Sequence, residues 1–378
     1  MDKDKVPYEE NYDVIVVGAG PAGLGVAIVL QKLGIDYLIL EKESIGSTFK
    51  KWPEETRFIS PSFTGNFFKM PDLNAITPDT SPAFDLLTEH PKGIDYVQYL
   101  EGVSKHFGLE IETNIEVRKI EKQENSFQIK TSKNTFRSSY VIWAAGEYQF
   151  PSTSSFDGDH YCCHYSEIAS FKEIQGPDII VIGAYESGFD AALNLVNLGK
   201  KVTLIDSFQF LEFINSDSSY SLSPFTRDRI DKEALDSIDY YPETRVEKIT
   251  VLNGTYTIST DAGQVFKTNH QPINCTGFDT GLVHVADHFD FENNYPLLNE
   301  YDESRKTNNF FLVGPQVKHG TALFCFIYKY RQRFAIVAEE IARQMKISHS
   351  EIHRVINEYK NNNFYLKDLS CCDDECVC

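Results

Sequence analysis

The chain contains one pattern twice, and this repeat restricts the possible folds more than any other feature of the sequence. A run rich in β-branched residues ends at Gly18, and a second such run ends at Gly183. After each glycine come a stretch with helical periodicity, another apolar run and an acidic residue, Glu41 or Asp206, 23 positions beyond the glycine in both copies. A continuous apolar run between helical patterns is typical of a buried parallel strand. Each copy is therefore predicted to form a βαβ unit.

The repeat continues beyond the two βαβ units. Strand patterns at 126–137 and 255–267 predict hairpins, and each hairpin leads into a short apolar strand that ends in glycine, Gly146 or Gly277. The same supersecondary plan therefore occurs twice. We expect an α/β fold with two Rossmann-like domains, each a parallel sheet with helices plus a β-hairpin or meander layer.

The remaining segments show weaker patterns. Residues 44–92 have little periodicity and are rich in Ser, Thr, Pro and Phe, so we expect irregular structure over a site. Residues 310–315 predict a strand that ends at a turn. A long helix is predicted over residues 321–345 and a further helix over residues 351–359.

The charge balance excludes some classes of partner. The chain has 378 residues, enough for two domains, and its 55 acidic and 36 basic side chains give a net charge of -19. This charge repels polyanions, so nucleic acid and anionic membranes are not expected as partners. The sequence begins without a signal-peptide pattern, and no run reaches the roughly 18 apolar residues of a membrane span. We expect a cytoplasmic protein that acts on a small molecule; the sequence does not indicate its oligomeric state.

The first copy matches the GxGxxG fingerprint of a dinucleotide-binding turn. Its glycines are Gly18, Gly20 and Gly23. They allow a tight turn, leave room for a pyrophosphate beside the backbone and permit close contact between helix and strand. The helix that starts at Pro21 and Ala22 presents unpaired N–H groups and the positive end of its dipole to phosphates. Glu41 is in the position that accepts hydrogen bonds from ribose hydroxyls. This copy is therefore predicted to bind a dinucleotide.

Six segments together carry a resemblance to a known family. They are GAGPAG at Gly18 with Glu41, GSTFKKWP at Gly46, WAAGEYQFP at Trp143, GAYESG at Gly183 with Asp206, NCTGF at Asn274 and FLVGP at Phe311. These segments span most of residues 12–345. On them the chain resembles the FAD/NAD(P)H flavoprotein oxidoreductases with two dinucleotide-binding domains, and within these the bacterial flavin-containing monooxygenases.

The resemblance implies which part of the chain binds which cofactor. It assigns residues 1–150 and 278–362 to an FAD domain and residues 151–277 to an NAD(P) domain. The polar composition of residues 363–378 separately predicts a flexible, acidic, cysteine-rich tail. The implied FAD contacts are Gly18, Gly20, Pro21, Ala22, Gly23, Glu41, Lys42, Thr48, Trp52, Val117, Ala145, Gly146, Gly314 and Thr321. The implied contacts of the nicotinamide cofactor are Gly183, Tyr185, Glu186, Ser187, Gly188, Asp206 and Gly277.

The second turn departs from the fingerprint, because Tyr185 stands where the middle glycine belongs. It is not a P-loop either, since Phe189 and Asp190 replace the Lys and the Ser or Thr of that motif. Two hypotheses remain: the nicotinamide cofactor binds with Tyr185 moved aside, or the domain keeps its fold without the ligand. The intact helix start after Tyr185 favours binding. Asp206 favours NADH because its charge repels a 2′-phosphate, whereas the resemblance favours NADPH.

The placement of cysteines guides the prediction of the reaction. The disulfide reductases of this superfamily carry a CxxxxC after the first βαβ unit or a CxxC in the second domain, and this chain has neither. Residues 44–92 contain no cysteine, and Ala22 stands at the fingerprint position where some small-thiol reductases have one. The leading prediction is an NAD(P)H-dependent monooxygenase that inserts one oxygen of O2 into a small molecule through a flavin hydroperoxide. The alternatives are a reductase of disulfides or soft metal ions that uses the tail, and a redox-sensing protein with structural FAD.

Three residues are catalytic candidates, and each has a structural alternative. Trp52 is placed near the flavin by the resemblance, and its alternative is ordinary packing. His164 follows Phe156 and Gly158 at a spacing that only partly meets the monooxygenase pattern FxGxxxH, so it orders the linker near the nicotinamide or simply bonds to the backbone. His319 precedes the long helix, where it approaches the flavin or lies on the surface.

The cysteines fall into three groups. Cys162 and Cys163 are adjacent in the linker and are interpreted as packing residues rather than as a redox pair. Cys275 and Cys325 are interpreted as small buried apolar residues. The cysteines of the tail are Cys371, Cys372, Cys376 and Cys378. These four are candidate ligands of Zn(II), Cu(I) or arsenite, candidate electron carriers from the flavin, or exposed thiols of an acidic tail.

Overall fold

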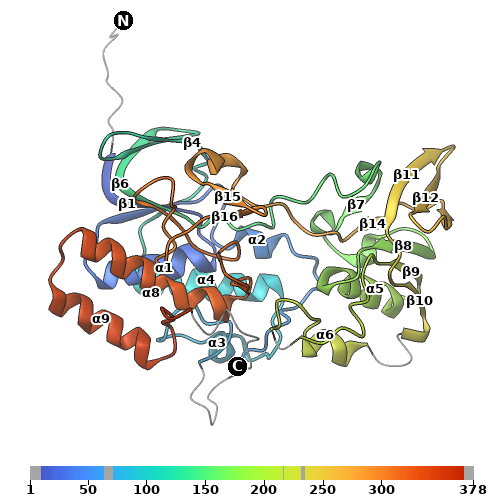
Figure 1. The fold of residues 1–378 in the computed structure, drawn as a ribbon. Coiled ribbons are helices and arrows are strands. Elements are labelled where there is room, and N and C mark those ends of the chain that lie inside the picture. Colours follow the sequence, from blue (N-terminus) through green and yellow to red (C-terminus); the bar gives the residue numbers. More distant parts are fainter. Residues whose placement is uncertain (1–9, 64–70, 216, 231–234, 370–378) are drawn as a thin grey trace, which may run out of the picture.

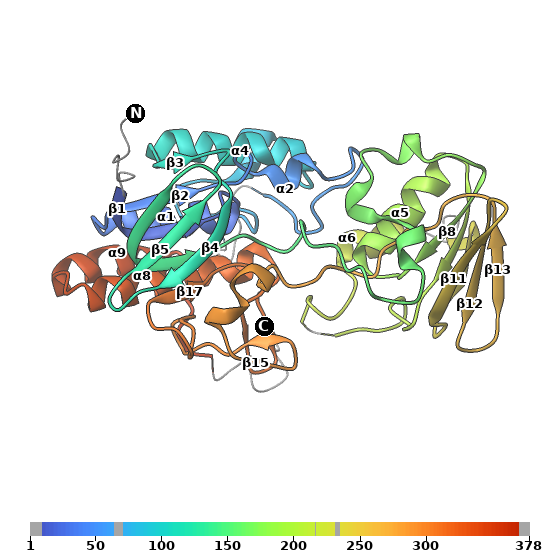
Figure 2. The ribbon, with the colours of Figure 1, turned by 90° about the horizontal axis from the view of Figure 1, so that it is seen from above.

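The computed structural model describes residues 10–63, 71–215, 217–230 and 235–369. They form a larger lobe, which contains both ends of the described chain, and a smaller lobe built from its middle part (Figure 1). Figure 2 shows the two lobes end to end, with extended segments running between them. Each lobe combines a parallel sheet with helices and an antiparallel meander. The predicted fold class is confirmed.

The larger lobe is built on a seven-stranded sheet in the order β3-β2-β1-β6-β5-β4, with β17 paired to the last residues of β6. Its strands are β1 (Glu10–Val17), β2 (Tyr37–Leu40), β3 (Ile111–Glu112), β4 (Val117–Lys122), β5 (Phe127–Thr131), β6 (Thr135–Trp143) and β17 (Phe310–Leu312). The strand β1 pairs in parallel with β2 and β6, while β3 pairs in parallel with β2 and β17 with β6. The strands β4, β5 and β6 form the antiparallel meander. The predicted hairpin after the first βαβ unit is thus part of the main sheet.

Helices cover this sheet on the side away from the β4–β5 hairpin (Figure 1). They are α1 (Pro21–Lys32), α2 (Ser47–Lys50), α3 (Pro82–Leu86), α4 (Gly93–Phe107), α8 (Ile327–Gln344) and α9 (His349–Asn361). The helices α1 and α8 pack closely because α1 has a glycine at their contact: a Cβ added to Gly25 would lie 2.0 Å from the ring of Phe334. The chain therefore returns from the smaller lobe to complete the core of the larger one.

The smaller lobe repeats the plan with a five-stranded parallel sheet in the order β10-β9-β8-β14-β7. Its strands are β7 (Cys163–His164), β8 (Asp178–Ile182), β9 (Lys201–Ile205), β10 (Ile238–Tyr241) and β14 (Ile273–Asn274). Its other elements are the helices α5 (Glu186–Asn197) and α6 (Pro224–Arg229) and the meander strands β11 (Val246–Leu252), β12 (Thr255–Thr260) and β13 (Val265–Thr268). Here the meander is a separate three-stranded sheet.

Short elements complete the described chain. They are the 3₁₀ turns η1 (Asp159–Tyr161), η2 (Tyr165–Glu167), η3 (Phe171–Glu173) and η4 (Val283–His288), and the strands β15 (Phe291–Glu292), β16 (Tyr295–Pro296), β18 (Lys318–His319) and β19 (Ala322–Leu323). The predicted start of the long helix was wrong, because the helix begins at Ile327 and not at residue 321. Before it, β18 and β19 pair around Gly320, whose φ of +56° suits glycine in a tight turn. The helix expected at 351–359 is confirmed as part of α9, and the domain boundaries stay a prediction.

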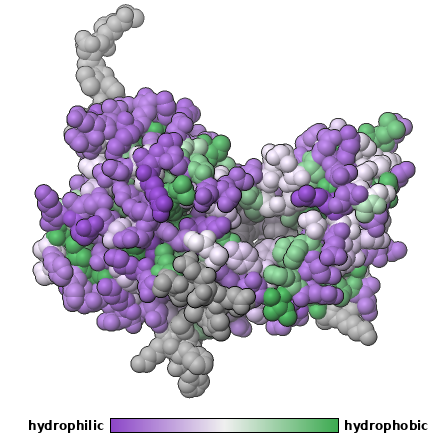
Figure 3. Space-filling model, in the orientation of Figure 1, coloured by the Kyte–Doolittle hydropathy of each residue, from purple (hydrophilic) through white to green (hydrophobic). Residues whose placement is uncertain are grey.

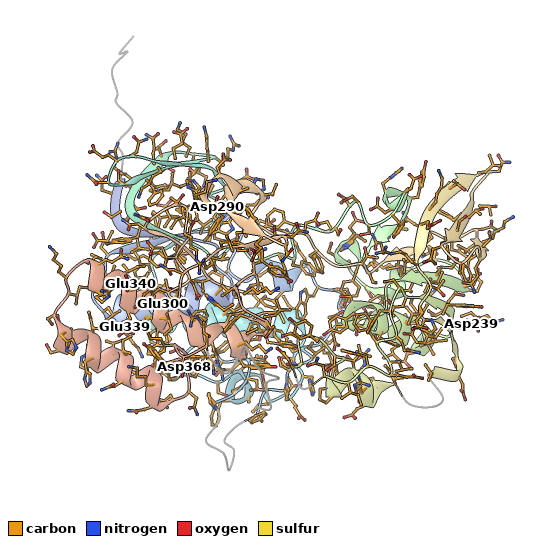
Figure 4. The ribbon with its side chains drawn as sticks, viewed as in Figure 1. Asp239, Asp290, Glu300, Glu339, Glu340 and Asp368 are labelled. Atoms are coloured by element: carbon orange, nitrogen blue, oxygen red, sulfur yellow. The ribbon has the colours of Figure 1, made fainter. Side chains whose placement is uncertain are left out.

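Acidic side chains occur on both lobes. Figure 4 labels Asp239 on the smaller lobe and Asp290, Glu300, Glu339, Glu340 and Asp368 on the larger one. Some have cationic partners, such as Glu340, which lies 2.7 Å from Arg343. The excess negative charge is thus distributed over the molecule. Among the described residues, no helix is long and apolar enough to cross a membrane.

Candidate active site

The main cavity lies between the two lobes and has a volume of about 620 Å³. Its wall includes Gly20, Trp52 and Gly146 of the larger lobe and Tyr185 and Arg229 of the smaller one. The space-filling view shows the molecule hollowed between its lobes (Figure 3). Both glycine-rich turns thus meet at one cavity, as expected for a site shared by two dinucleotides.

The first glycine-rich turn has the geometry of a phosphate cradle. Gly18 follows β1 with a φ of +108°, and a Cβ there would lie 2.6 Å from the Ala144 carbonyl oxygen. A Cβ at Gly23 would lie 1.9 Å from the carbonyl oxygen of Gly18, so this position also requires glycine. A Cβ at Gly20, in contrast, would have no described atom within 4 Å beyond its chain neighbours. Gly20 therefore leaves open space beside the backbone, into which a pyrophosphate fits.

The start of α1 supports this assignment. Its first turn contains no acidic residue and begins with Pro21, and no side chain caps it. The N–H groups of Ala22 and Gly23 and the helix dipole are thus available to an anion. Glu41 follows β2 at the cavity wall, where its carboxylate accepts hydrogen bonds from the N–H groups of Ala19 and Glu43, both at 2.8 Å. A carboxylate has further lone pairs, so Glu41 can also accept a ribose hydroxyl.

The other residues predicted to contact FAD separate into two groups. Those in the cavity wall are Lys42, Thr48, Trp52, Val117, Ala145 and Gly146. Trp52 packs against Phe49 and Phe58, with ring centroids 5.0 Å from each. Gly314 lies just behind the turn, since a Cβ there would be 3.5 Å from Ala22 Cβ. Thr321 is outside the wall, and its carbonyl accepts a hydrogen bond from Tyr220.

The second turn has the same outer glycines. A Cβ at Gly183, which has a φ of +92°, would lie 2.6 Å from the Cys275 carbonyl oxygen, and a Cβ at Gly188 would lie 1.9 Å from the Gly183 carbonyl oxygen. Neither glycine lines the cavity. Tyr185 fills the middle position with extended backbone, which any residue adopts. Its hydroxyl donates to the carbonyls of Ser221 and Ser218 at 3.0 and 3.3 Å.

An acidic side chain occupies the start of α5. Glu186 accepts hydrogen bonds from Ser223 N and from Thr226 Oγ1, both at 2.5 Å. Burial raises the pKa of its carboxyl. Because Glu186 and Tyr185 both line the cavity, the protein's own side chains lie where the first turn has open space. Ser187 also belongs to the wall.

Two further predicted nicotinamide contacts, Asp206 and Gly277, are not part of the cavity wall. Asp206 is only 3% exposed, and burial raises the pKa of its carboxyl, although it accepts hydrogen bonds from backbone N–H groups. Gly277 does not line the cavity, and its carbonyl oxygen accepts a hydrogen bond from Nε2 of His164 at 3.0 Å. Neither residue is exposed to the cavity in the arrangement described.

The two histidine candidates are also outside the main cavity. His164 forms hydrogen bonds with Gly277 and Ser166 within the smaller lobe, as expected if its role is structural. Burial lowers the pKa of its imidazole. His319 lines a separate, smaller cavity, where its Nε2 lies 2.5 Å from Asp302 Oδ1. Asp302 in turn pairs with the buried Arg333 at 2.9 Å. Of the three catalytic candidates, Trp52 alone lines the main cavity.

The described cysteines agree with prediction except at one position. Cys162 and Cys275 are buried and Cys163 is partly buried, as packing residues should be. Cys325 was predicted to be buried and is instead exposed, because it precedes α8 and forms part of the cavity wall. The four tail cysteines, Cys371, Cys372, Cys376 and Cys378, lie outside the described residues.

The site also contains residues that the sequence did not single out. Asp190 accepts hydrogen bonds from Thr56 and Tyr165, both at 2.7 Å, and from Arg229 at 2.7 Å. Thr56 belongs to the larger lobe, so this buried carboxylate ties the two lobes together beside the cavity. The position of Asp190, two residues after the last glycine of the second turn, is the signal that could have indicated it.

The fold and the cavity define a flavoprotein oxidoreductase with two dinucleotide-binding folds. Residues 15–314 match the family model described as pyridine nucleotide-disulphide oxidoreductase, which is most of the chain. The chain belongs to this family and is an FAD-dependent oxidoreductase that uses a pyridine nucleotide. The predicted family and cofactors are thus confirmed.

Similar proteins include both reductases and monooxygenases. The bacilliredoxin reductase Bdr of Bacillus subtilis is 28% identical over 341 residues, which cover 87% of this chain and 97% of that protein. The bacillithiol disulfide reductase Bdr of Staphylococcus aureus has a TM-score of 0.75 at 22% identity, over 89% of this chain and 99% of that one. A flavin-containing monooxygenase from Stenotrophomonas maltophilia has a TM-score of 0.63 at 15% identity, over 93% and 99%. At these identities the two structures show the shared fold.

Proposed function

We propose that the protein is an NAD(P)H-dependent flavoprotein reductase that acts on the disulfide of a small molecule. The observation that carries the proposal is the composition of the cavity, which brings the open cradle at Gly20 together with the thiol of Cys325. The near full-length relative from Bacillus subtilis is named a bacilliredoxin reductase, which supports sulfur chemistry. Oxygen insertion, the leading prediction from the sequence, becomes the alternative function.

The residues of the larger lobe have defined tasks in this proposal. The N–H groups at the start of α1 bind the pyrophosphate of FAD beside Gly20, and Glu41 accepts hydrogen bonds from a ribose. Trp52, with the aromatic rings around it, forms an apolar wall that excludes water. When bound, FAD supplies the chemistry of accepting a hydride from the nicotinamide and passing two electrons to an acceptor.

We further propose that residues 1–150 and 278–362 form the FAD domain and residues 151–277 the NAD(P) domain. The nicotinamide cofactor approaches from the smaller lobe, whose cavity wall contains Ser187 and Arg229. Arg229 is paired with Asp190, and its side chain is 23% exposed, so it can also meet a phosphate. Tyr185 and Glu186 limit that approach.

A monooxygenase is the second candidate. Of the cysteines that the structure describes, Cys325 alone lines the cavity, so no pair there can form a disulfide in the manner of a dithiol reductase. Oxygen chemistry needs no such pair.

Anaerobic reduction followed by a choice of oxidant separates the two functions. The purified protein is reduced with NADH or NADPH, and then oxidised glutathione, cystine or O2 is added while the flavin absorbance is recorded. If the protein is a reductase, the disulfide reoxidises its reduced flavin and two thiols are released per flavin. Reoxidation by O2 alone, with an oxygenated product, would instead establish the monooxygenase.

A further inference from the structure

We propose that Cys325 is the covalent site of this reductase: its sulfur exchanges with a small-molecule disulfide, while Glu147 accepts the thiol proton. This inference rests on the proposed function. The sulfur of Cys325 receives the substrate, and the reaction uses this single cysteine. The substrate class is a low-molecular-weight disulfide, because Cys325 lies in the wall of a cavity between the lobes.

The surroundings of Cys325 favour a reactive thiol. The residue lies directly before α8, whose N-cap is Phe326, so the positive end of an 18-residue helix is close to the sulfur. Its Sγ is 3.1 Å from Ser219 Oγ, and Ser219 Oγ also accepts a hydrogen bond from Lys329 at 2.6 Å. A hydroxyl thus connects the thiol to the ammonium group of Lys329, which also forms an ion pair with Asp217. A helix start and a nearby lysine are the features that stabilise a thiolate.

Two polar side chains without partners line the same cavity. Tyr330 is 6% exposed, and its hydroxyl makes no hydrogen bond to any residue in the described parts of the chain. The carboxyl of Glu147, directly after Gly146, likewise has no hydrogen-bond partner among them. Buried polar groups nearly always have a partner in a folded protein. The hydroxyl of the nearly buried Tyr330 therefore indicates a ligand with polar atoms beside Cys325, and the partly buried carboxyl of Glu147 lines the same cavity.

The charges at the cavity explain why a base is needed. Although Cys325 is exposed to the cavity, the surrounding protein atoms desolvate its thiol and raise its pKa. Ser219 and Lys329 lower this pKa, and the charges of Glu147 and Asp217 raise it further. The thiol is therefore protonated near neutral pH and must lose its proton on attack. Burial raises the pKa of Glu147 to about 7, so its carboxylate is available at that pH. Burial and the charge of Glu147 also raise the pKa of Tyr330, which stays a neutral donor.

The exchange step keeps the number of disulfide bonds constant. The Cys325 sulfur attacks one sulfur of RS–SR, a Cys325–S–S–R bond forms and the substrate S–S bond breaks. The proton passes from Cys325 to Glu147 and then to the departing RS⁻, with the Tyr330 hydroxyl as a hydrogen-bond donor to it. Reduction of the mixed disulfide by two electrons and one proton would release a second RS–H and the Cys325 thiolate, and another proton would restore the thiol. FAD, when bound, would supply the two electrons from NAD(P)H. The net reaction turns one disulfide into two thiols.

Peptide mapping of the full-length protein tests the inference without turnover. The oxidised protein is incubated with oxidised glutathione, its free thiols are blocked, and the adducts are located by mass spectrometry. We expect a mixed disulfide at Cys325 that is absent in Cys325→Ser and present in the control Cys163→Ser, which changes a cysteine outside the cavity wall. Replacing all four tail cysteines by Ser should leave the Cys325 adduct in place. A wild-type protein without an adduct at Cys325 would overturn the inference.

A second variant tests the base. Glu147→Gln should slow adduct formation at pH 7 by roughly 10²-fold, the effect of losing a general base. The difference should shrink at high pH, where hydroxide removes the thiol proton. Equal rates for Glu147→Gln and wild type across this range would remove Glu147 from the step.

Steady-state assays separate the inference from the proposed function. If Cys325→Ser binds FAD and still reduces disulfides at the wild-type rate, the covalent role of Cys325 is wrong and the reductase stands. If the wild-type protein fails to consume any disulfide under anaerobic conditions, the proposed function is wrong. The mapping experiment then still decides whether Cys325 exchanges with disulfides.

Discussion

The turns at Gly18 and Gly183 have nearly the same backbone conformation but differ in the side chains that they carry. In both, the first glycine has a positive φ, +108° or +92°, and a Cβ at the last glycine would lie 1.9 Å from the carbonyl of the first. The middle position has open space at Gly20 but carries the side chain of Tyr185 in the second turn. The helix that follows begins with Pro21 in one copy and Glu186 in the other.

The difference shows that fold and ligand are specified by different residues. The outer glycines are required by contacts within the protein, so they are the same in both copies. The middle residue and the first helical residue face the cavity, and there the copies diverge. A match to the outer glycines therefore indicates the Rossmann turn, whereas the residues between them indicate what the turn can bind.

The largest effect is expected from adding a side chain at the last glycine of each turn, where the helix contacts the carbonyl of the first glycine. Gly23→Ala and Gly188→Ala each place a methyl 1.9 Å from a carbonyl oxygen, and the backbone must move to admit it. Such overpacking costs about 1–3 kcal/mol, so both variants should unfold at lower urea concentration. Urea unfolding followed by circular dichroism measures this. Gly102→Ala in α4, where an added Cβ meets no described atom within 4 Å, is the matched control and should be neutral or slightly stabilising. A wild-type midpoint for either turn variant would contradict the equivalence of the two turns.

The second effect concerns the middle residue of the second turn. Tyr185→Gly removes the ring beside α5 and should tighten the binding of the nicotinamide cofactor roughly tenfold, which is about 1.4 kcal/mol. Calorimetric titration of the FAD-loaded protein with NADP⁺ and NAD⁺ measures the affinity. Tyr185→Phe keeps the ring but loses the hydrogen bonds to Ser218 and Ser221, so it should bind as the wild type does. Weaker binding by Tyr185→Gly would mean that the cofactor uses the ring as a contact surface.

A smaller effect is expected from the charge at the start of α5. Glu186→Gln removes a negative charge from a helix N-terminus, where charge effects amount to about 0.3–1 kcal/mol. The affinity for NADP⁺ should rise about two- to fivefold, and the gain should fall as salt is added. Glu173→Gln changes an exposed acid elsewhere on the smaller lobe and should have no effect. An unchanged affinity in Glu186→Gln would show that phosphates do not approach this helix.

A pH dependence distinguishes the residues that follow the two strand-ending glycines, because Glu147 after Gly146 can titrate and Phe278 after Gly277 cannot. Burial raises the pKa of Glu147 in the folded protein to about 7. Protonated Glu147 therefore contributes stability at low pH, and this contribution is lost as the pH rises through about 7. The wild-type midpoint of urea unfolding should fall relative to Glu147→Gln between pH 5 and pH 8. Parallel curves for the two proteins would contradict an elevated pKa at this position.

The sequence predicted the fold well because its signals are local. Strand runs that end in glycine, and an acid at a fixed distance beyond, report the βαβ unit regardless of the rest of the chain. The start of α8 was placed six residues too early, since the β18–β19 hairpin is too short to produce a strand pattern. Such errors arise where a turn, rather than periodicity, determines the structure.

The cavity could be predicted only in part. The first turn, Trp52 and the residues after β6 were anticipated, because the fingerprint and the resemblance point directly to them. Cys325, Asp190 and Glu147 were not, since their importance depends on which segments the fold brings together across the two lobes. From the sequence, a cysteine before a helix is interpreted as a packing residue. The cavity wall contains Cys325 only because the chain returns to the larger lobe at this point.

The most direct test of this account is a titration of FAD into three apoproteins: wild type, Gly20→Tyr and Tyr185→Gly. The central claim is that the open space at Gly20 holds the pyrophosphate of FAD, while the second turn does not. The wild type and Tyr185→Gly should bind one FAD per chain with similar affinity, and Gly20→Tyr should bind at least roughly 100-fold more weakly, about 2.8 kcal/mol. Wild-type FAD affinity in Gly20→Tyr, or loss of FAD in Tyr185→Gly, would contradict the claim.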